Sequence, residues 1–297
     1  MIKQQLSGIC LAMVLALHAP LMAEDTMDNG NEAQAATTSA STAEEDYQAA
    51  LLCDDQDKGI PLLLSAAKQG HAKAQLELGR CYLNGDGVPQ NDSTAAKWFQ
   101  LAAEQGEDEA QLVLGCCYEK GRGVPKNYTK AVKWYKLAAK QGAADAQFVL
   151  GSCYAEGLGV KKNYSEAVKW YKRAAKQGEA DAQFRLGLCY AKGQGVPENY
   201  PEALKWYKLA AEQGIVNAQL ILGGHYGLEG NVTESAKWYK LAADQGDAGA
   251  QYSLGLMYIS GRGVNKNLAE GIRLLRQAHA NGNSDATKKL KSLGVKP

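Results

Sequence analysis

The residues of this sequence with the most obvious capacity for chemistry are four cysteines spaced 36 residues apart. Each directly precedes a tyrosine, and a histidine and a methionine continue the series at the equivalent positions. The column comprises Cys81, Cys117, Cys153, Cys189, His225 and Met257. Thiolate, imidazole and thioether groups bind soft metal ions, and thiols pair as disulfides in oxidising compartments.

Spacing on a helical scaffold argues against both kinds of chemistry. Equivalent positions on neighbouring packed helices lie about 8–10 Å apart, whereas a disulfide spans at most ~7 Å between Cα atoms. Zinc ligands, each about 2.3 Å from one ion, require still closer approach. We therefore predict that the column fills the core and that the chain holds no metal and no cofactor. Cys116, beside the column, is predicted to be the exposed thiol, and the oxidation states of Cys53 and Cys116 stay open.

A serine nucleophile is the second candidate, because Ser65 and Lys68 form a Ser-x-x-Lys sequence in which the lysine could deprotonate the serine. The segment aligns, however, with Leu101–Glu104 and Leu137–Lys140, which repeat without serine. The Lys-Thr-Gly and Ser-Asp-Asn sequences that accompany such a serine are also missing. We therefore predict an ordinary helical segment and no catalytic residue.

The elements that carry these residues are repeated along the chain. Ala-Gln recurs at intervals of 36, 36, 36, 36 and 32 residues, followed by Leu-Gly and then by Tyr. Ala, Leu, Gly and Tyr at positions i, i+4, i+5 and i+8 share one face of a helix, which we call helix A. The six alanines are Ala74, Ala110, Ala146, Ala182, Ala218 and Ala250.

A loop and a second helix complete each copy. Gly-x-Gly-Val, as at 85–88, follows helix A and supplies the left-handed glycine that ends a helix; its valine is expected to pack into the core. A recurring Asn then precedes the second helix, helix B, as an N-cap. In the last four copies Glu lies three residues further on, which resembles a capping box. The four glutamates are Glu166, Glu202, Glu234 and Glu270.

All five tryptophans fall in one column of helix B, and Leu274 takes this place in the last copy. Burying one Trp removes on the order of 200 Å² from water, a contribution of up to ~5 kcal/mol. A single helix pair cannot bury such a face, but stacked pairs can. We therefore expect Trp98, Trp134, Trp170, Trp206 and Trp238 to join neighbouring helix pairs.

These two signatures together, Ala-x-x-x-Leu-Gly-x-x-Tyr-x-x-Gly-x-Gly-Val and Ala-x-x-Trp-x-x-x-Ala-Ala-x-x-Gly, resemble the SEL-one-like repeat family, a longer-looped relative of the tetratricopeptide repeat. The resemblance implies an all-α, right-handed superhelical solenoid of antiparallel helix pairs with helix A on its concave face. It further implies a protein-binding scaffold. Cysteine-rich members of the family, some linked to penicillin binding or hydrolysis, pair their cysteines at other positions, a pattern that this chain lacks.

The predicted organisation follows from the repeats. Six repeats occupy 71–106, 107–142, 143–178, 179–214, 215–246 and 247–282, and the fifth has lost four loop residues. A degenerate N-terminal half-repeat is expected at 47–70 and a C-terminal capping segment at 283–297. Residues 24–46 carry seven acidic and no basic residues and no apolar period, which is typical of a disordered linker.

The first 23 residues resemble a secretory signal peptide. Lys3 precedes a short apolar run, and Leu21-Met22-Ala23 offers a small-residue cleavage site before Glu24. The run is shorter than the ~20 residues that span a membrane. We therefore expect a periplasmic or secreted bacterial protein without a membrane span. Nucleic acid is not expected as a partner of an exported chain whose positive charge is spread thinly.

Function should reside in the positions that differ between copies, because the recurrent ones are needed for packing. Three variable positions on helix A predict a groove that is charged at its N-terminal end and more apolar towards its C-terminal end; the alternative is that the apolar members only adjust packing. The groove candidates are Lys73, Glu77, Arg80, Glu109, Val113, Cys116, Asp145, Val149, Ser152, Asp181, Arg185, Leu188, Asn217, Ile221, Ser253 and Leu256.

We predict that the chain is not an enzyme and binds a segment of another protein, and no small-molecule substrate, along this groove. By the resemblance, such a scaffold would act in envelope assembly, host contact or virulence. Two alternatives stay open: a penicillin-recognising activity, and an adaptor that assembles with itself through its ends.

Overall fold

The computed structural model describes residues 41–53 and 56–296, and every regular element in these two ranges is an α-helix. The helices form two compact units, the described residues up to Lys162 and those from Asn163. The boundary falls between the two helices of the third repeat. The predicted all-α architecture of paired helices is confirmed. The predicted signal peptide and residues 24–40 of the predicted linker lie outside the described residues.

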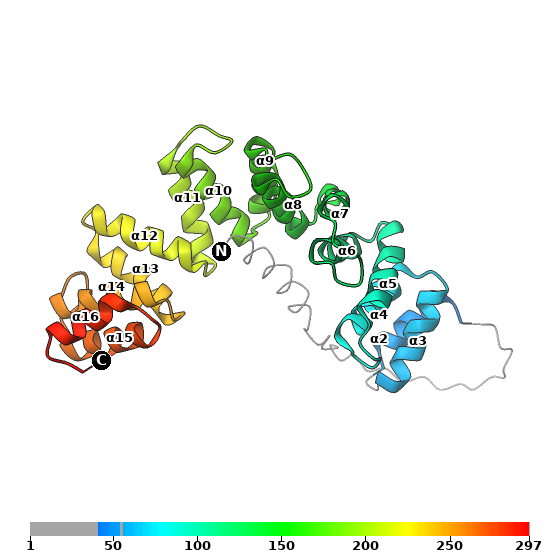
Figure 1. Cartoon of the computed structure of the whole chain (residues 1–297), viewed down its shortest axis with the longest axis horizontal. Coiled ribbons are helices and arrows are strands. Elements are labelled where there is room, and N and C mark those ends of the chain that lie inside the picture. Colours follow the sequence, from blue (N-terminus) through cyan, green and yellow to red (C-terminus); the bar gives the residue numbers. More distant parts are fainter. Residues whose placement is uncertain (1–40, 54–55, 297) are drawn as a thin grey trace, which may run out of the picture. The chain divides into compact units, whose positions relative to one another are not determined.

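The first unit contains seven helices, and each packs against the next (Figure 1). Its helices are α2 (Ala43–Leu51), α3 (Gln56–Lys68), α4 (Ala72–Asn84), α5 (Asp92–Glu104), α6 (Asp108–Lys120), α7 (Tyr128–Gln141) and α8 (Ala144–Glu156). Helices α4, α6 and α8 are A helices, and α5 and α7 are B helices.

The second unit contains eight helices in the same alternation. They are α9 (Tyr164–Lys176), α10 (Ala180–Lys192), α11 (Tyr200–Glu212), α12 (Val216–Leu228), α13 (Val232–Asp244), α14 (Ala248–Ser260), α15 (Leu268–Ala280) and α16 (Ser284–Ser292). Helices α10, α12 and α14 are A helices. In the described ranges, none of the fifteen helices combines the length and apolar character that a membrane crossing requires.

The N-terminal end differs from the prediction. Helix α2 begins at Ala43, so the expected disordered linker does not extend to residue 46. Thr42 forms a full capping box with Glu45, a local signal that outweighs the polar composition. Residues 43–68 therefore form a complete helix pair rather than a half-repeat. At the other end, α16 covers the last repeat with buried Ala286 and Leu290.

The predicted N-caps of helix B are present, but the predicted capping boxes are not. The Asn127 carboxamide oxygen accepts a hydrogen bond from the Lys130 amide at 2.9 Å, and the other five asparagines do the same in their repeats. The Glu166 carboxylate does not accept a hydrogen bond from the backbone amide of the N-cap Asn163. It pairs instead with Lys169, one turn later, at 2.5 Å. The other three glutamates also pair with a base at i+3. A cation there competes for the carboxylate that would otherwise close the box.

Helix A and helix B of one repeat touch where helix A has a glycine and helix B an aromatic ring. A Cβ on Gly115 of α6 would lie 2.4 Å from Cε1 of Tyr135 in α7, and one on Gly79 would lie 2.5 Å from Cε1 of Phe99. Gly187 has the same relation to Tyr207. These three rings are fully or almost fully buried. The glycine therefore permits a helix separation that no other residue allows.

The fully buried ring is the residue after the tryptophan, and the tryptophans are less buried than we expected. Trp98, Trp134, Trp170 and Trp206 are only half-buried, and Trp238 alone falls below a tenth exposed, at 7%. Adjacent residues on a helix point about 100° apart, so only one of the two can face the glycine. The tryptophan still joins neighbouring helix pairs as expected, because Trp134 of α7 packs against the core that contains Phe99 of the preceding repeat.

The loops are held by a second close approach. Gly123, at φ +72°, lies so near the first turn of α5 that a Cβ would be 1.9 Å from the carbonyl oxygen of Asp92. A glycine at this point of the Gly-x-Gly-Val loop therefore lets the loop contact helix B of the preceding repeat, and Gly159, Gly195 and Gly263 make the same approach. The following valine, Val124, packs against the core as predicted.

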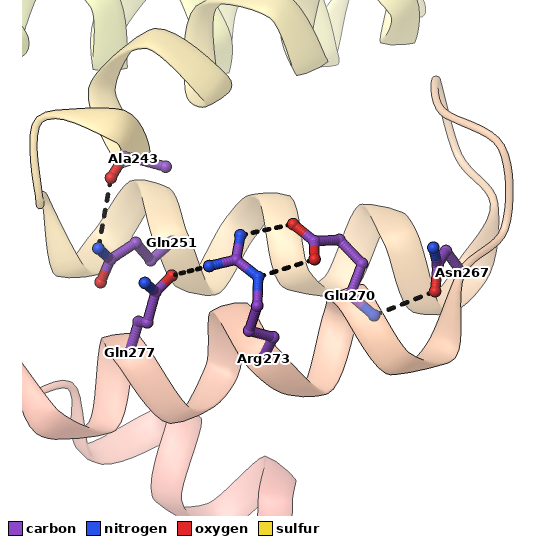
Figure 2. A network of polar contacts seen from close by, with 6 residues as sticks. All are labelled: Ala243, Gln251, Asn267, Glu270, Arg273 and Gln277. Atoms are coloured by element: carbon purple, nitrogen blue, oxygen red, sulfur yellow. Dashed lines mark hydrogen bonds and ion pairs between the residues drawn. The ribbon is translucent and has the colours of Figure 1, made fainter.

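The recurring glutamine forms a ladder of buried amides. Gln111 Nε2 donates to the carbonyl oxygen of Ala103 in the preceding helix B at 3.1 Å, and its Oε1 accepts from Gln141 Nε2 at 3.0 Å. In the second unit Gln251 donates to Ala243 in the same way (Figure 2). Each such glutamine joins three helices and adds a side-chain hydrogen bond to a carbonyl at the end of helix B that already accepts a backbone amide.

We predict that Gly115→Ala lowers the free energy of unfolding by about 1–2 kcal/mol. Overpacking against Tyr135 costs about 1–3 kcal/mol, which exceeds the gain in helix propensity of at most ~1 kcal/mol. Chemical denaturation followed by circular dichroism measures this.

Gly224→Ala is the matched control. Its Cβ would meet only the Tyr239 hydroxyl, at 3.6 Å. This variant should be as stable as the wild type or up to ~1 kcal/mol more stable. Equal stability of Gly115→Ala and wild type would refute the role given to this glycine.

Candidate protein-binding surface

The cysteine column lies in the core, as predicted. Cys117, Cys153 and Cys189 are buried and Cys81 is half-buried. Burial raises the pKa of the Cys81 and Cys189 thiols to about 11. Both thiols are therefore protonated at neutral pH, and a protonated thiol is neither a nucleophile nor a metal ligand. Within the described ranges, no three His, Cys, Asp or Glu side chains are placed to hold a metal ion.

Cys116 is buried, at 4% exposure, so its predicted exposure is wrong. It lies on the inner side of α6, where the Tyr135 hydroxyl is 3.5 Å from its sulfur and donates to Glu119 Oε2 at 2.7 Å. The ring that packs against Gly115 thus carries its hydroxyl to this side of the helix and covers Cys116.

Ser65 has a structural partner. Its hydroxyl donates to the Asp46 carboxylate of α2, which also accepts from Ser41 and, at 2.9 Å, from Gln69. The hydrogen bond from Ser41, then that from Ser65 and that from Gln69, lower the pKa of Asp46. Ser65 therefore joins α2 to α3. Its hydroxyl donates a hydrogen bond to the Asp46 carboxylate and is not directed to Lys68.

In the first unit, four of the predicted groove residues are buried, so their assignment to a partner-binding surface is wrong. Val113 is 5% exposed and belongs to the core cluster that contains Phe99 and Leu83 of the preceding repeat. The apolar positions of α6 and α8 thus serve packing, the alternative that the sequence left open. The four residues are Val113, Cys116, Val149 and Ser152.

Charged groove residues of the first unit form a cluster between two repeats. Arg80 of α4 pairs with Glu77 on its own helix at 2.6 Å and with Glu109 of α6. The Arg80 side chain is 19% exposed, and among the described residues its Nε has no hydrogen-bond partner. Burial, opposed by Arg80, raises the pKa of Glu77. Because these ions bridge repeats, their charges stabilise the fold and are poor positions for a test of partner binding.

Three further charged candidates lie at the first turns of A helices. Lys73 and Asp145 are exposed, and Asp181 is half-buried. Partial burial raises the pKa of Asp145, and it raises that of Asp181 against the opposing effect of Arg185. Carboxylates at a helix N-terminus are stabilised by the helix dipole. A partner cation placed beside these desolvated groups would stabilise them further.

In the second unit the candidates keep accessible surface. Arg185, Leu188, Ile221 and Leu256 are half-buried on α10, α12 and α14. Leu188 and Ile221 pack at the edge of the core around Tyr207 without being covered by it. Asn217 is exposed and Ser253 is half-buried, so the candidates of this unit combine polar and apolar groups. They are the part of the predicted surface in which a partner can contact both polar and apolar side chains.

The fifth repeat contains a feature that the sequence reasoning missed. A pocket of about 590 Å³ opens beside α12, and Tyr239 and Arg262 are among its lining residues. Neither was a predicted site residue. The 32-residue interval and the adjacent glycines of this repeat were the available signals.

Stacked helix pairs held by recurrent residues, with variable side chains left on one helix, define a repeat scaffold. The Sel1 repeat model matches residues 72–107, 108–142, 144–179, 180–215, 216–247 and 248–283. The chain belongs to the Sel1 repeat family, as its sequence signatures predict. Proteins of this family generally mediate protein–protein interaction and are typically non-enzymatic.

Two solved structures are similar over most of the chain. A protective antigen of uropathogenic Escherichia coli with an SLR fold is 42% identical, with a TM-score of 0.76, over 78% of this chain and 50% of that one. This chain therefore spans half the length of that antigen. A Sel1 repeat protein from Oxalobacter formigenes is 36% identical, with a TM-score of 0.65, over 80% of this chain and 94% of that one. No functionally curated protein matches the sequence.

The Asp46 contacts predict a pH-dependent attachment of α2. Because its pKa is lowered on folding, the carboxylate stabilises the folded state fully above its unfolded pKa of about 3.9, and this stabilisation is lost as the pH falls through the folded value. Amide exchange of α2, measured by mass spectrometry, should speed up relative to that of α7 as the pH falls below about 4.

Asp46→Ala should raise α2 exchange at pH 7 and remove this extra acid sensitivity. Glu45→Ala, which removes a carboxylate of the same helix from the capping box, serves as the comparison and should keep the acid response. An α2 whose acid response is the same with and without Asp46 would contradict the role of the carboxylate.

Proposed function

We propose that this chain is a protein-interaction scaffold outside the bacterial cytoplasm and that a segment of its partner lies on the A helices of the second unit. One observation carries the proposal: the recurrent Ala, Gln, Leu and Gly of α10, α12 and α14 are buried, whereas the residues that differ between these helices keep accessible surface. The buried recurrent residues pack the fold and are not available to a ligand, whereas the variable residues are available.

The variable residues suit a polypeptide segment. Leu188, Ile221 and Leu256 offer apolar surface for affinity, and Arg185 and Asn217 offer directional hydrogen bonds that would set the register of a bound segment. Positions on successive A helices meet successive parts of such a segment. A role in envelope assembly, host contact or virulence is part of the proposal, since the SEL-one-like repeat family that the sequence resembles has members with such roles.

The location rests on the sequence of the first 23 residues, which lie outside the described ranges. Lys3, the apolar run and Ala23 have the order and spacing of a cleavable export signal. A scaffold behind such a signal would meet its partner in the periplasm or outside the cell.

A photo-crosslinking amino acid at Leu188 or Ile221 should capture one protein in intact cells. The same amino acid at Leu209 or Leu241, exposed leucines of α11 and α13, should not. These controls match the test positions in residue type and unit and differ in the helix that carries them. Capture only from α11 and α13 would place the partner on helix B and defeat the proposal.

Binding of the captured protein should weaken about tenfold with Arg185→Ala, because interface arginines often contribute more than 1 kcal/mol. Arg276→Ala, an exposed arginine of α15, should leave affinity unchanged. Isothermal titration calorimetry on purified components measures both.

The mature protein is predicted to begin at Glu24. Intact-mass spectrometry of protein recovered from the periplasm or culture medium should show loss of residues 1–23. Lys3→Glu should slow this processing, because the positive start of the signal is removed. A cytoplasmic protein that keeps Met1 would contradict the export proposal.

A further inference from the structure

The fifth repeat departs from its neighbours at the pocket beside α12. Its loop is four residues shorter, so only Glu229 and Gly230 separate the end of α12 at Leu228 from the cap Asn231. Leu228 is left 92% exposed at the rim. The segment that follows helix A in other repeats is therefore missing on this side.

Two glycines hollow the face of α12. Gly224 and Gly227 lie one turn apart, where the fourth repeat has Leu188 and Ala191 and the sixth has Leu256 and Ile259. A Cβ on Gly224 would first meet the Tyr239 hydroxyl, at 3.6 Å, so the space above this glycine is open. The pocket of about 590 Å³ occupies it, and this volume falls in the range of ligand-binding pockets.

The floor and wall of the pocket are built by α13 and α14. Ser235, which replaces the alanine of most other repeats, is buried and donates to the carbonyl oxygen of Gly223 at 2.6 Å. Leu256 and Met257 supply apolar wall, and Tyr239 and Ser253 supply hydroxyl groups. Burial, opposed by a hydrogen bond from Ser253, raises the pKa of Tyr239, so its hydroxyl stays protonated and able to donate.

Arg262 gives the pocket a positive group. Its counterpart in the second repeat, Arg122, is satisfied: Nε donates to Asp92 Oδ2 and a terminal nitrogen to the Leu83 carbonyl oxygen, each at 3.0 Å. The residue equivalent to Asp92 beside Arg262 is Val232. Among the described residues no carboxylate pairs with the Arg262 guanidinium.

The acidic residue of the shortened loop has another partner. Glu229 lies 3.4 Å from His225 Nε2, one turn back on the same segment. The arginine therefore faces the pocket with its charge uncompensated. Guanidinium groups bind carboxylates in a bidentate geometry that lysine does not offer.

We propose that this pocket is an anchor site for an acidic segment of the partner protein, in which a large apolar side chain fills the space above Gly224 and a neighbouring carboxylate pairs with Arg262. The inference rests on the proposed function and adds the chemistry of the partner. The apolar wall of the pocket contacts the apolar side chain of the partner. The unpaired Arg262 guanidinium favours partner segments in which an acidic residue follows that apolar residue.

Met257 makes the test site-specific. It lines the pocket, and the other four methionines of the chain lie at or before residue 27. Methyl-labelled methionine in the full chain therefore gives one NMR resonance from residues 41–53 and 56–296. The probes are two blocked hexapeptides, alanine except for a central phenylalanine followed by glutamate or by glutamine, and N-acetyl-phenylalanine as a free small ligand.

The Met257 methyl resonance should shift saturably with the glutamate peptide and require at least about tenfold more of the glutamine peptide. Gly224→Leu, which restores the residue of the neighbouring repeats and fills the pocket, should abolish the shift without loss of thermal stability. Arg262→Gln should reduce the affinity of the glutamate peptide to that of the glutamine peptide. Lys266→Gln, with the same charge loss in the same loop, should have no effect.

Absence of a shift with the glutamate peptide, equal affinity for the two peptides, or binding that persists in Gly224→Leu would overturn the inference. N-acetyl-phenylalanine binding as tightly as the peptide would indicate a small-molecule site and would also overturn it. Capture of a partner from Leu188 and Ile221 that persists in Gly224→Leu would leave the proposed function standing while the pocket inference fails. Peptide binding in the pocket without capture of a partner from Leu188 and Ile221 would support the pocket inference and contradict the proposed function.

Discussion

The fold depends on the missing side chain of one glycine in each A helix. Because Gly115 has no Cβ, the Tyr135 ring lies directly against the backbone of α6, and the same relation holds at Gly79 and Gly187. Helices in ordinary contact are 8–10 Å apart, and a glycine facing a ring is a way to bring them close while a large apolar surface is buried. The ring also ends beyond the helix, where its hydroxyl meets Cys116 and Glu119. The contact between glycine and ring therefore sets the separation of helix A and helix B, and it determines which neighbouring residues of helix A the ring covers.

This covering explains why the two units offer different surfaces to a partner. In the first unit the variable positions behind the ring carry Val113 and Val149, which are absorbed into the core. The charged positions in front are partly used by Arg80 to join two repeats. In the second unit the same columns hold Arg185, Leu188 and Ile221, which keep accessible surface. A position that varies between repeats is therefore not always free for recognition. In some helices the variable residue packs in the core, and in others it stays accessible.

The sequence was sufficient for the features that recur, because repetition averages out local accidents. The helix pairs, the asparagine caps, the loop glycines and the burial of the cysteine column all follow from period and residue type. It was insufficient where two adjacent residues compete for one direction. Trp134 and Tyr135 are both large and aromatic, and only the rotation of α7 about its axis decides which one faces Gly115. Cys116 and Val113 were misassigned for the same reason.

Two other differences come from competition between contacts of similar strength. The Glu166 carboxylate could close a capping box or pair with Lys169, and it pairs. Residues 43–46 could remain extended or begin a helix, and the reciprocal contacts of Thr42 and Glu45 favour the helix. Among the candidate site residues, the charged ones of the first unit and all those of the second unit keep accessible surface, whereas the apolar and small ones of the first unit are buried. The pocket was visible in the sequence as a shortened loop and two extra glycines, but a deletion by itself does not show whether neighbouring side chains fill the space.

The amide ladder has a consequence for how such a chain can change in length. Each glutamine reaches one carbonyl behind it and accepts from one amide ahead of it, and these partners are the same from copy to copy. A duplicated block of 36 residues would therefore meet matching groups at both joints and leave no polar atom stranded. Gain or loss of residues inside a helix would rotate every later donor away from its acceptor, whereas the fifth repeat lost four residues in its loop and kept both amide contacts of Gln219. Whole copies and loops are the parts that such a gene can add or trim while the remaining copies keep their partners.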